Sequence, residues 1–327
     1  MKKVSILVPC FNEEASLPFL YKKLTQVVDG LSGYEWEFLF VNDGSRDKTL
    51  EVLYQLRQED RRVNYLELSR NFGKESAMLA GFDFVTGESV ILMDADLQHP
   101  PSLIPQMLAE WENGYQDVYA KRQSRGHESW LRNRASLLFY RLLNQYSRFD
   151  ILQNVGDFRL LDRQCINALV QLRETERYTK GMFSWIGFNK KELLFDQQDR
   201  VAGKSKWTFK SLFNLAVEGI TSFTTSPLRL ATIVGTIIAV FSVLAGLFFL
   251  IKTLFWGDQV RGFTTLIVFI SFLGGIQLMA IGILGEYIGK IFNEVKRRPV
   301  YLLKSLNGEA LSPQSYKDDP KRLSSLK

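Results

Sequence analysis

Cysteine is scarce in this sequence, and the two cysteines lie far apart. Cys10 and Cys165 are the only ones among 327 residues, which excludes a disulfide framework and the paired spacing of a zinc site. The first residues also lack the long apolar run and the small-residue cleavage site of a signal peptide, because the short run 4–8 ends at Pro9. We therefore expect the amino terminus to stay in the cytoplasm.

An excess of positive charge is missing from most of the chain. The formal net charge is +6, but residues 1–228 contain 29 basic and 29 acidic residues, whereas residues 286–327 contain nine basic and five acidic ones. A nucleic-acid-binding domain carries its positive charge on the folded part. This distribution therefore argues against nucleic acid as a partner.

Charge is absent altogether from two stretches near the carboxyl end. Residues 230–251 and 263–285 are 22 and 23 residues long, enough to cross a bilayer core. Buried core helices are the alternative, but consecutive runs of this length favour membrane spans at 230–252 and 263–285, within a segment 229–289. Lysine and arginine flank the pair, so the positive-inside rule predicts a hairpin with both termini in the cytosol. Glycines in the second run suit close helix contacts and a homo-oligomer.

Strand and helix patterns alternate through residues 1–120. Apolar strands are predicted at 4–8, 37–42, 63–68 and 90–93, and helices at 12–28, 49–59 and 75–85. Repeated βα units predict an α/β fold with a mostly parallel, doubly wound sheet, in a cytosolic domain that spans 1–206. In such sheets the ligand binds beyond the carboxyl ends of the strands.

Two further segments combine aromatic and basic residues at helical spacing. Residues 207–223, in a predicted juxtamembrane helix 207–228, favour a membrane interface. For residues 127–149, an interface helix and a core-facing helix with solvated arginines fit the pattern equally well. The last segment, 290–327, is predicted as a basic cytosolic tail, partly disordered because it contains prolines, Asn307-Gly308 and mixed charges.

Two carboxylates directly follow the predicted strand 90–93. Asp94 and Asp96, with Gln98 two residues further on, place three side-chain oxygens at the end of a buried strand. Mg²⁺ and Mn²⁺ prefer oxygen ligands, and Mg²⁺ completes its shell with substrate phosphates. The sequence therefore predicts a divalent metal site here. His99 is a further candidate ligand, with a packing or turn-capping role as the alternative.

Acidic residues also follow the first two strands. Asp43 comes directly after strand 37–42, where an acidic side chain can bind a base or a ribose hydroxyl. A capped βα turn is the alternative, and that role suits Asp47. Glu13, just after the first strand, is a second candidate for the same pocket.

The segments 8–14, 41–45 and 94–98 resemble three signatures of family 2 glycosyltransferases, which have the GT-A fold. Segments 69–75, 154–160 and 200–207 extend the resemblance to the polyprenyl-phosphate sugar transferases, relatives of dolichol-phosphate mannose synthase. Segments 219–223 and 284–289 are most similar to the bactoprenol glucosyltransferases of bacteria and phage. The resemblance therefore implies a GT-A domain anchored in the bacterial inner membrane.

The resemblance also implies roles for individual residues. Asp94, Asp96 and Gln98 would hold Mg²⁺ or Mn²⁺ against the diphosphate, and Asp157 takes the place of the acceptor-side residue often assigned as a base. Two arginines, Arg122 and Arg200, would face phosphate oxygens in catalysis. The residues expected to bind the nucleotide sugar or the lipid phosphate are Pro9, Glu13, Asp43, Lys74, Arg132, Arg134, Lys204 and Lys206.

The reaction that the resemblance implies is inverting transfer of a sugar to undecaprenyl phosphate, with UDP-glucose favoured as donor. A phosphate monoester has a second pKa of about 6, so the acceptor is already ionised near neutral pH and hardly needs a base. We therefore expect Asp157 to orient the acceptor or a cation, with a general-base role as the alternative.

Three other functions are alternatives to glucosyl transfer onto undecaprenyl phosphate. A processive polysaccharide synthase is disfavoured, because the sequence lacks a Gln-x-x-Arg-Trp motif and further spans. An inactive membrane scaffold or lipid-translocating subunit is disfavoured by the intact Asp94, Asp96, Gln98 and Arg200. The same reaction with GDP-mannose, UDP-N-acetylglucosamine or an aminoarabinose nucleotide stays open.

Overall fold

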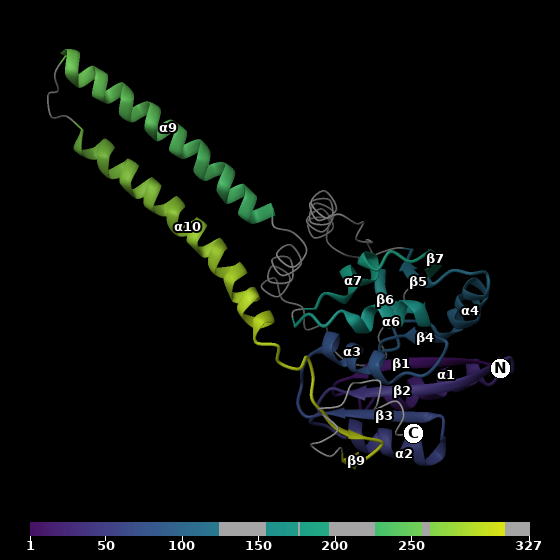
Figure 1. The fold of residues 1–327 in the computed structure, drawn as a ribbon. Helices are drawn as coiled ribbons and strands as arrows, with labels where there is room; N and C mark the ends of the chain where they lie inside the picture. The colour runs from purple at the N-terminus through teal and green to yellow at the C-terminus, as the bar shows by residue number, and fades with distance from the viewer. Residues whose placement is uncertain (124–154, 176, 196–225, 257–261, 311–327) are drawn as a thin grey trace. The chain divides into compact units, whose positions relative to one another are not determined.

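The computed structural model describes residues 1–123, 155–175, 177–195, 226–256 and 262–310 (Figure 1). The chain divides into two compact units. The first is an α/β unit, whose described strands form one sheet of nine in the order β7-β5-β6-β4-β1-β2-β3-β8-β9. The second contains two long helices.

Four parallel strands form the centre of the sheet. They are β1 (Lys2–Cys10), β2 (Tyr34–Asn42), β3 (Val63–Leu68) and β4 (Ser89–Leu92). The helices between them are α1 (Leu17–Val28), α2 (Thr49–Glu59) and α3 (Lys74–Phe84). The predicted α/β fold with a mostly parallel central sheet is thereby confirmed.

Helices cover both faces of this central sheet, so β1 and β2 are apolar on both sides. Ile6 and Val8 pack into one core with residues of α1 and α2, whereas Leu7 packs into a second core with residues of α3. Burial on both faces explains why β1 has a continuous apolar run rather than an alternating one.

Three strands extend the sheet beyond β4. They are β5 (Asp117–Arg122), β6 (Val155–Asp162) and β7 (Lys190–Phe195), accompanied by η1 (Pro101–Leu103), α4 (Ile104–Glu112), α6 (Arg163–Gln171) and α7 (Thr179–Trp185). Strand β6 is antiparallel to both β4 and β5, and β7 is parallel to β5. In the β4–β6 pair, Leu92 lies opposite Arg159, so the residues that follow Leu92 run towards Asp157.

Two short strands near the carboxyl end of the chain form the other edge of the sheet. Strand β8 (Leu303–Leu306) pairs antiparallel with β3, and β9 (Glu309–Ala310) pairs with β8. Between them, Asn307 and Gly308 have φ values of +53° and +86°, as a type I′ hairpin turn requires. Part of the expected tail 290–327 is thus ordered on the sheet, whereas residues 311–327 lie outside the described part.

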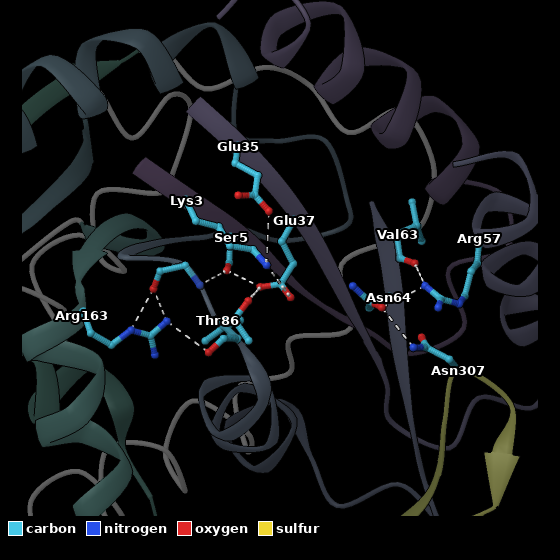
Figure 2. Close-up of polar contacts among 12 residues, drawn as sticks. Lys3, Ser5, Glu35, Glu37, Arg57, Val63, Asn64, Thr86, Arg163 and Asn307 are labelled. Atoms are coloured by element: carbon cyan, nitrogen blue, oxygen red, sulfur yellow. Dashed lines mark hydrogen bonds and ion pairs between the residues drawn. The ribbon is translucent and has the colours of Figure 1, made fainter. Parts of the chain in front are cut away.

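Two polar clusters hold elements together away from the carboxyl ends of the strands (Figure 2). In one, Glu37 accepts hydrogen bonds from the Ser5 hydroxyl at 2.6 Å and from the Thr86 N–H at 2.9 Å. In the other, the Asn307 side chain donates to Asn64 at 3.0 Å. Asn307 also accepts from the Tyr65 N–H at 2.9 Å. The second cluster fastens the β8–β9 hairpin to β3.

The second unit contains helices α9 (Ser226–Trp256) and α10 (Phe263–Val295), which lie side by side and contact each other (Figure 1). They occupy the two predicted charge-free runs, although α10 continues ten residues past Gly285. Among the residues that are described, one stretch is long and apolar enough to cross a membrane, Phe272–Val295, and none of it is buried. The two-span hairpin stays a prediction.

Candidate active site

The carboxyl ends of β1, β2 and β4 meet at one edge of the sheet, and the loops that follow them carry the predicted acidic residues. The Asp43 N–H donates to the Cys10 carbonyl at 2.9 Å, and the Met93 N–H donates to the Leu7 carbonyl at 3.1 Å. Asp43 and Asp94 therefore follow β2 and β4, the two strands that flank β1, at the edge where doubly wound sheets bind ligands.

Asp43 is buried, and both of its carboxylate oxygens accept backbone hydrogen bonds. The Phe72 N–H donates to Oδ1 at 2.7 Å and the Gly73 N–H donates to Oδ2 at 2.9 Å. Burial raises the pKa of Asp43, and the two hydrogen bonds only partly offset that effect. This carboxylate thus fixes the backbone just before α3, and its contact with a base or ribose stays a prediction.

The first and second loops are joined by reciprocal hydrogen bonds. The Asn12 N–H donates to the Ser45 hydroxyl at 2.9 Å, and the Arg46 N–H donates to the Asn12 side-chain oxygen at 2.8 Å. The Glu13 N–H donates to the Thr49 hydroxyl at 2.8 Å. These bonds fix where Glu13 stands relative to the loop that follows β2.

The Glu13 carboxylate lies within the electric field of the two aspartates after β4. Burial raises its pKa, a hydrogen bond from the Ser16 hydroxyl lowers it, and the charges of Asp96 and Asp94 raise it further. Pro9 is buried near the end of β1. Glu13, Asp94 and Asp96 thus form an acidic group at the edge of the sheet.

The loop from Asp94 to Gln98 has a strained backbone. The Gln98 N–H donates to Asp96 Oδ1 at 3.1 Å. Leu97, which is buried, has a φ of +61°, a conformation that costs a branched residue about 1 kcal/mol or more. Such strain is typical of functional sites, where the surrounding structure holds the backbone in place.

The donor set of this loop suits a hard divalent cation. Asp94 and Asp96 offer carboxylates and Gln98 an amide oxygen, and the Asp94 side chain is 26% exposed and so reachable from solvent. Across the described ranges, no three carboxylate, imidazole or thiol groups converge as a metal cage. Mg²⁺ typically takes one or two protein carboxylates and completes its shell with phosphates and water, so Asp94 and Asp96 remain its predicted ligands.

Lys74, the first residue of α3, connects this loop to β6. Its ammonium lies 2.5 Å from Asp94 Oδ1 and 2.5 Å from Asp157 Oδ2. Burial alone would lower the pKa of Lys74, but the two carboxylates outweigh that effect and raise it well above its usual value. One lysine therefore links Asp94, a predicted metal ligand, to Asp157, which is predicted to face the acceptor.

Asp157 is buried on β6 and is held ionised by its neighbours. Burial would raise its pKa, but the charges of Lys74 and Lys180 and the hydrogen bond from Lys74 hold it well below the ordinary value. In the described part of the chain, its second oxygen, Oδ1, is buried and has no hydrogen-bond partner. Asp157 thus has one acceptor position free.

Lys180 lies at the start of α7, which is anchored to α3. Glu75 accepts hydrogen bonds from the Thr179 N–H at 3.0 Å and from the Thr179 hydroxyl. This contact fixes α7 relative to α3 and so helps to position Lys180, whose charge acts on Asp157. No local sequence pattern marks Lys180, because its effect on Asp157 depends on tertiary packing.

His99 packs inside the α/β unit. Its ring stacks on Phe158 at a centroid distance of 5.2 Å and meets the edge of Phe195 at 5.9 Å. Burial lowers its pKa, and both ring nitrogens lack hydrogen-bond partners among the described residues. These ring contacts agree with the packing role that was left open, and no contact assigns a metal to this side chain.

Of the other predicted site residues, Arg122 lies in the described part of the chain and five lie outside it. Arg122 ends β5, next to the strand that carries Asp157. The remaining predicted site residues lie outside the described residues: Arg132, Arg134, Arg200, Lys204 and Lys206. The predicted helix 207–228 and the segment 127–149 also lie almost wholly outside them. The structure therefore brings together Glu13, Asp94, Asp96, Lys74 and Asp157.

Comparisons with known proteins cover almost the whole chain. The chain is 44% identical over 303 residues to the bactoprenol glucosyl transferase of Shigella phage SfX, covering 93% of this chain and 99% of that protein. It is 43% identical over 306 residues to a glycosyltransferase of Synechocystis, covering 94% and 96%.

Among solved structures, the glucosyl-3-phosphoglycerate synthase of Mycobacterium tuberculosis, in complex with Mn²⁺, UDP and phosphoglyceric acid, is similar with a TM-score of 0.45 and 16% identity. That similarity covers 67% of this chain and 76% of the other, and it is too low to bear on function. Residues 5–170 match the family described as glycosyl transferase family 2, and the motifs after β1, β2 and β4 lie within that range. The chain therefore belongs to glycosyl transferase family 2.

Proposed function

We propose that this enzyme transfers glucose from UDP-glucose to a polyprenyl phosphate, undecaprenyl phosphate in bacteria, at the cytosolic face of the inner membrane. The observation that carries the proposal is the link from Asp94 through Lys74 to Asp157, which joins a metal-binding motif to an acceptor-side carboxylate. The relatives at 44% identity that are named bactoprenol glucosyl transferase support the choice of sugar and lipid.

On the donor side, Asp94, Asp96 and Gln98 would hold Mg²⁺ or Mn²⁺, which when bound offsets the negative charge that develops on the diphosphate leaving group. Arg122 and Arg200 would add positive charge to the same phosphate oxygens. Glu13, Asp43 and Pro9 would line the nucleoside pocket. The field of Asp94 and Asp96 at Glu13 supports one shared pocket.

On the acceptor side, the lipid phosphate oxygen attacks the anomeric carbon from the face opposite the leaving diphosphate. The configuration at that carbon inverts, so an α-linked donor gives a β-linked product. Since the phosphate is already largely ionised, Asp157 has little proton to remove. Its low pKa supports an orienting role, because a weakly basic carboxylate is a poor general base.

The membrane arrangement is part of the proposal. We expect α9 and α10 to cross the bilayer as a hairpin, with the α/β unit and both termini in the cytosol. The exposed apolar side chains of α10 and the lysines and arginines that follow it support this orientation. A lipid phosphate keeps its head group at the interface, so an anchored enzyme stays near its acceptor.

The experiment that tests the proposal offers membranes containing the full chain a panel of nucleotide sugars together with undecaprenyl phosphate. UDP-glucose is expected to give a lipid whose mass increases by one hexose, and GDP-mannose, UDP-N-acetylglucosamine and an aminoarabinose nucleotide are expected to give much less product. If another donor were preferred, the proposed sugar would be wrong, but the proposed transfer to a polyprenyl phosphate would stand. No lipid product from any donor would favour the inactive scaffold.

A further inference from the structure

Lys74 holds two carboxylates that have different tasks in the proposed function. Its ammonium is 2.5 Å from Oδ1 of Asp94, on the metal side, and 2.5 Å from Oδ2 of Asp157, on the acceptor side. Asp94 follows β4 and Asp157 lies on β6, and these two strands pair antiparallel. One positive charge thus lies between two negative charges and offsets them in part.

A divalent cation that coordinates Oδ1 of Asp94 would compete with the Lys74 ammonium for that oxygen. The two positive charges would also repel each other, so metal binding there favours release of Lys74 from Asp94. The Lys74 side chain is 41% exposed and unbranched, so it can swing away without unpacking the core. Asp157 is only 9% exposed and stays where β6 places it.

The released ammonium stays near the place where the acceptor phosphate must react. A phosphate with two negative charges is repelled by the buried carboxylate of Asp157 unless cations lie between them. Lys180, whose charge already acts on Asp157, supplies one such cation. Lys74, at the amino-terminal end of α3, supplies the second, and the positive end of the helix dipole adds to it.

Resting on the proposed function, we propose that Lys74 is a built-in counter-ion that exchanges partners during the reaction. In the empty site it pairs with both Asp94 and Asp157. When the donor arrives with its metal, Lys74 leaves Asp94 and, together with Lys180, binds the phosphate of the acceptor. Loading the donor side therefore prepares the acceptor side, and the donor binds before the acceptor.

The direct test is the affinity of the purified full chain for Mn²⁺ alone, measured by electron paramagnetic resonance. Lys74→Met removes the competing charge, so Mn²⁺ binding is expected to tighten by about fivefold, the upper end of what an exposed ion pair is worth. Lys74→Arg keeps the charge and is expected to stay within about twofold of the parent. An unchanged or weaker affinity in Lys74→Met, or equal tightening in both variants, would overturn the exchange.

A matched control is Lys304→Met, which removes a lysine that lies 2.7 Å from Glu67 at the β8 edge. Its Mn²⁺ affinity and its activity are expected to equal those of the parent. A melting curve for each variant separates loss of folding from loss of binding, and Lys74→Arg keeps the buried Asp157 paired if Lys74→Met proves unstable.

The acceptor arm uses farnesyl phosphate as substrate and inorganic phosphate as a competitor. Lys74→Met and Lys180→Met are each expected to raise KM for farnesyl phosphate by about tenfold. At saturating metal, neither variant is expected to raise KM for the nucleotide sugar. Inorganic phosphate is expected to compete weakly in the parent, because it lacks the lipid, and more weakly still in both variants. An unaltered KM for farnesyl phosphate in Lys74→Met would contradict the acceptor role.

The two proposals can fail separately. If the parent binds Mn²⁺ but transfers no sugar, the proposed function fails while the Mn²⁺ result still decides whether Lys74 competes with the metal. If the parent transfers glucose and Lys74→Met leaves Mn²⁺ affinity and acceptor KM unchanged, only the exchange fails.

Discussion

At the residue scale, the charge of Asp157 bears on how the acceptor phosphate reacts. Its pKa lies well below the ordinary value, so it stays ionised throughout the neutral range. The free Oδ1 would compete poorly for a proton with a phosphate whose second pKa is about 6. The pH dependence of the reaction should therefore belong to the acceptor rather than to this carboxylate.

We expect the rate to fall as the pH falls through about 6, because the acceptor phosphate takes up a proton and becomes a poorer nucleophile. Initial rates between about pH 5 and pH 9 measure this limb. Asp157→Asn should lower the rate but leave the midpoint in place. If the acidic limb disappeared or moved in that variant, Asp157 would be the base.

Asp43 gives a second residue-scale prediction, this time for stability. Asp43→Asn replaces one of the two acceptors of the Phe72 and Gly73 N–H groups with an amide NH₂, which should cost about 1–3 kcal/mol. Denaturant unfolding measures the loss. Asp29→Asn, at an exposed ion pair with Arg62, is the control and should cost less than about 1 kcal/mol. Equal losses would mean that the buried contacts of Asp43 carry no special weight.

At the element scale, Gly44 decides whether the loop after β2 can approach the loop before α3. Its φ is +64°, and an added Cβ would lie 2.5 Å from the carbonyl carbon of Arg70 and 2.6 Å from the nitrogen of Asn71. We expect Gly44→Ala to lower the free energy of unfolding by more than about 2 kcal/mol. Gly114→Ala has a similar positive φ but open space, and should cost only about 1 kcal/mol. Equal costs in a denaturant titration would show that the close approach is unimportant.

The hairpin formed by β8 and β9 gives a second element-scale prediction. Asn307→Ala removes the hydrogen bonds to Asn64 and Tyr65, so the hairpin should detach from β3 more often. Hydrogen exchange measured by mass spectrometry should then quicken in Val63–Leu68 by about tenfold, the effect of losing about 1.4 kcal/mol. Exchange as slow as in the parent would show that the strand pairing alone holds the hairpin.

Local pattern and long-range pairing explain which elements could be predicted from the sequence. The bounds of α2 and β3 agree with the prediction, because periodicity within about ten residues defines them. The hydrogen bond from Tyr65 to Asn307 joins residues 242 apart, and the Lys74–Asp157 contact joins residues 83 apart, so no local pattern predicts either contact. The Asn307-Gly308 dipeptide is typical of a type I′ turn, so the prediction that it belongs to a disordered tail is wrong at this point.

At the scale of the whole molecule, the hairpin anchor makes a topological prediction. Both native cysteines are buried, so we expect them to react little with a thiol reagent and to interfere little with labelling of an introduced cysteine. Asp258→Cys, between the two predicted spans, should react with a membrane-impermeant maleimide in intact spheroplasts. Lys304→Cys, on β8, should react only after permeabilisation. Equal labelling of both thiols in intact spheroplasts would contradict the cytosolic placement of the carboxyl end.

We propose that this site transfers glucose with inversion onto the phosphate of a polyprenyl lipid. The decisive measurement incubates the purified full chain with Mg²⁺, UDP-glucose and undecaprenyl phosphate, and determines the mass and the anomeric configuration of the lipid product. We expect one added hexose in the β configuration, and no product from Asp94→Asn. An α-linked product, or equal turnover by Asp94→Asn, would contradict the proposed reaction.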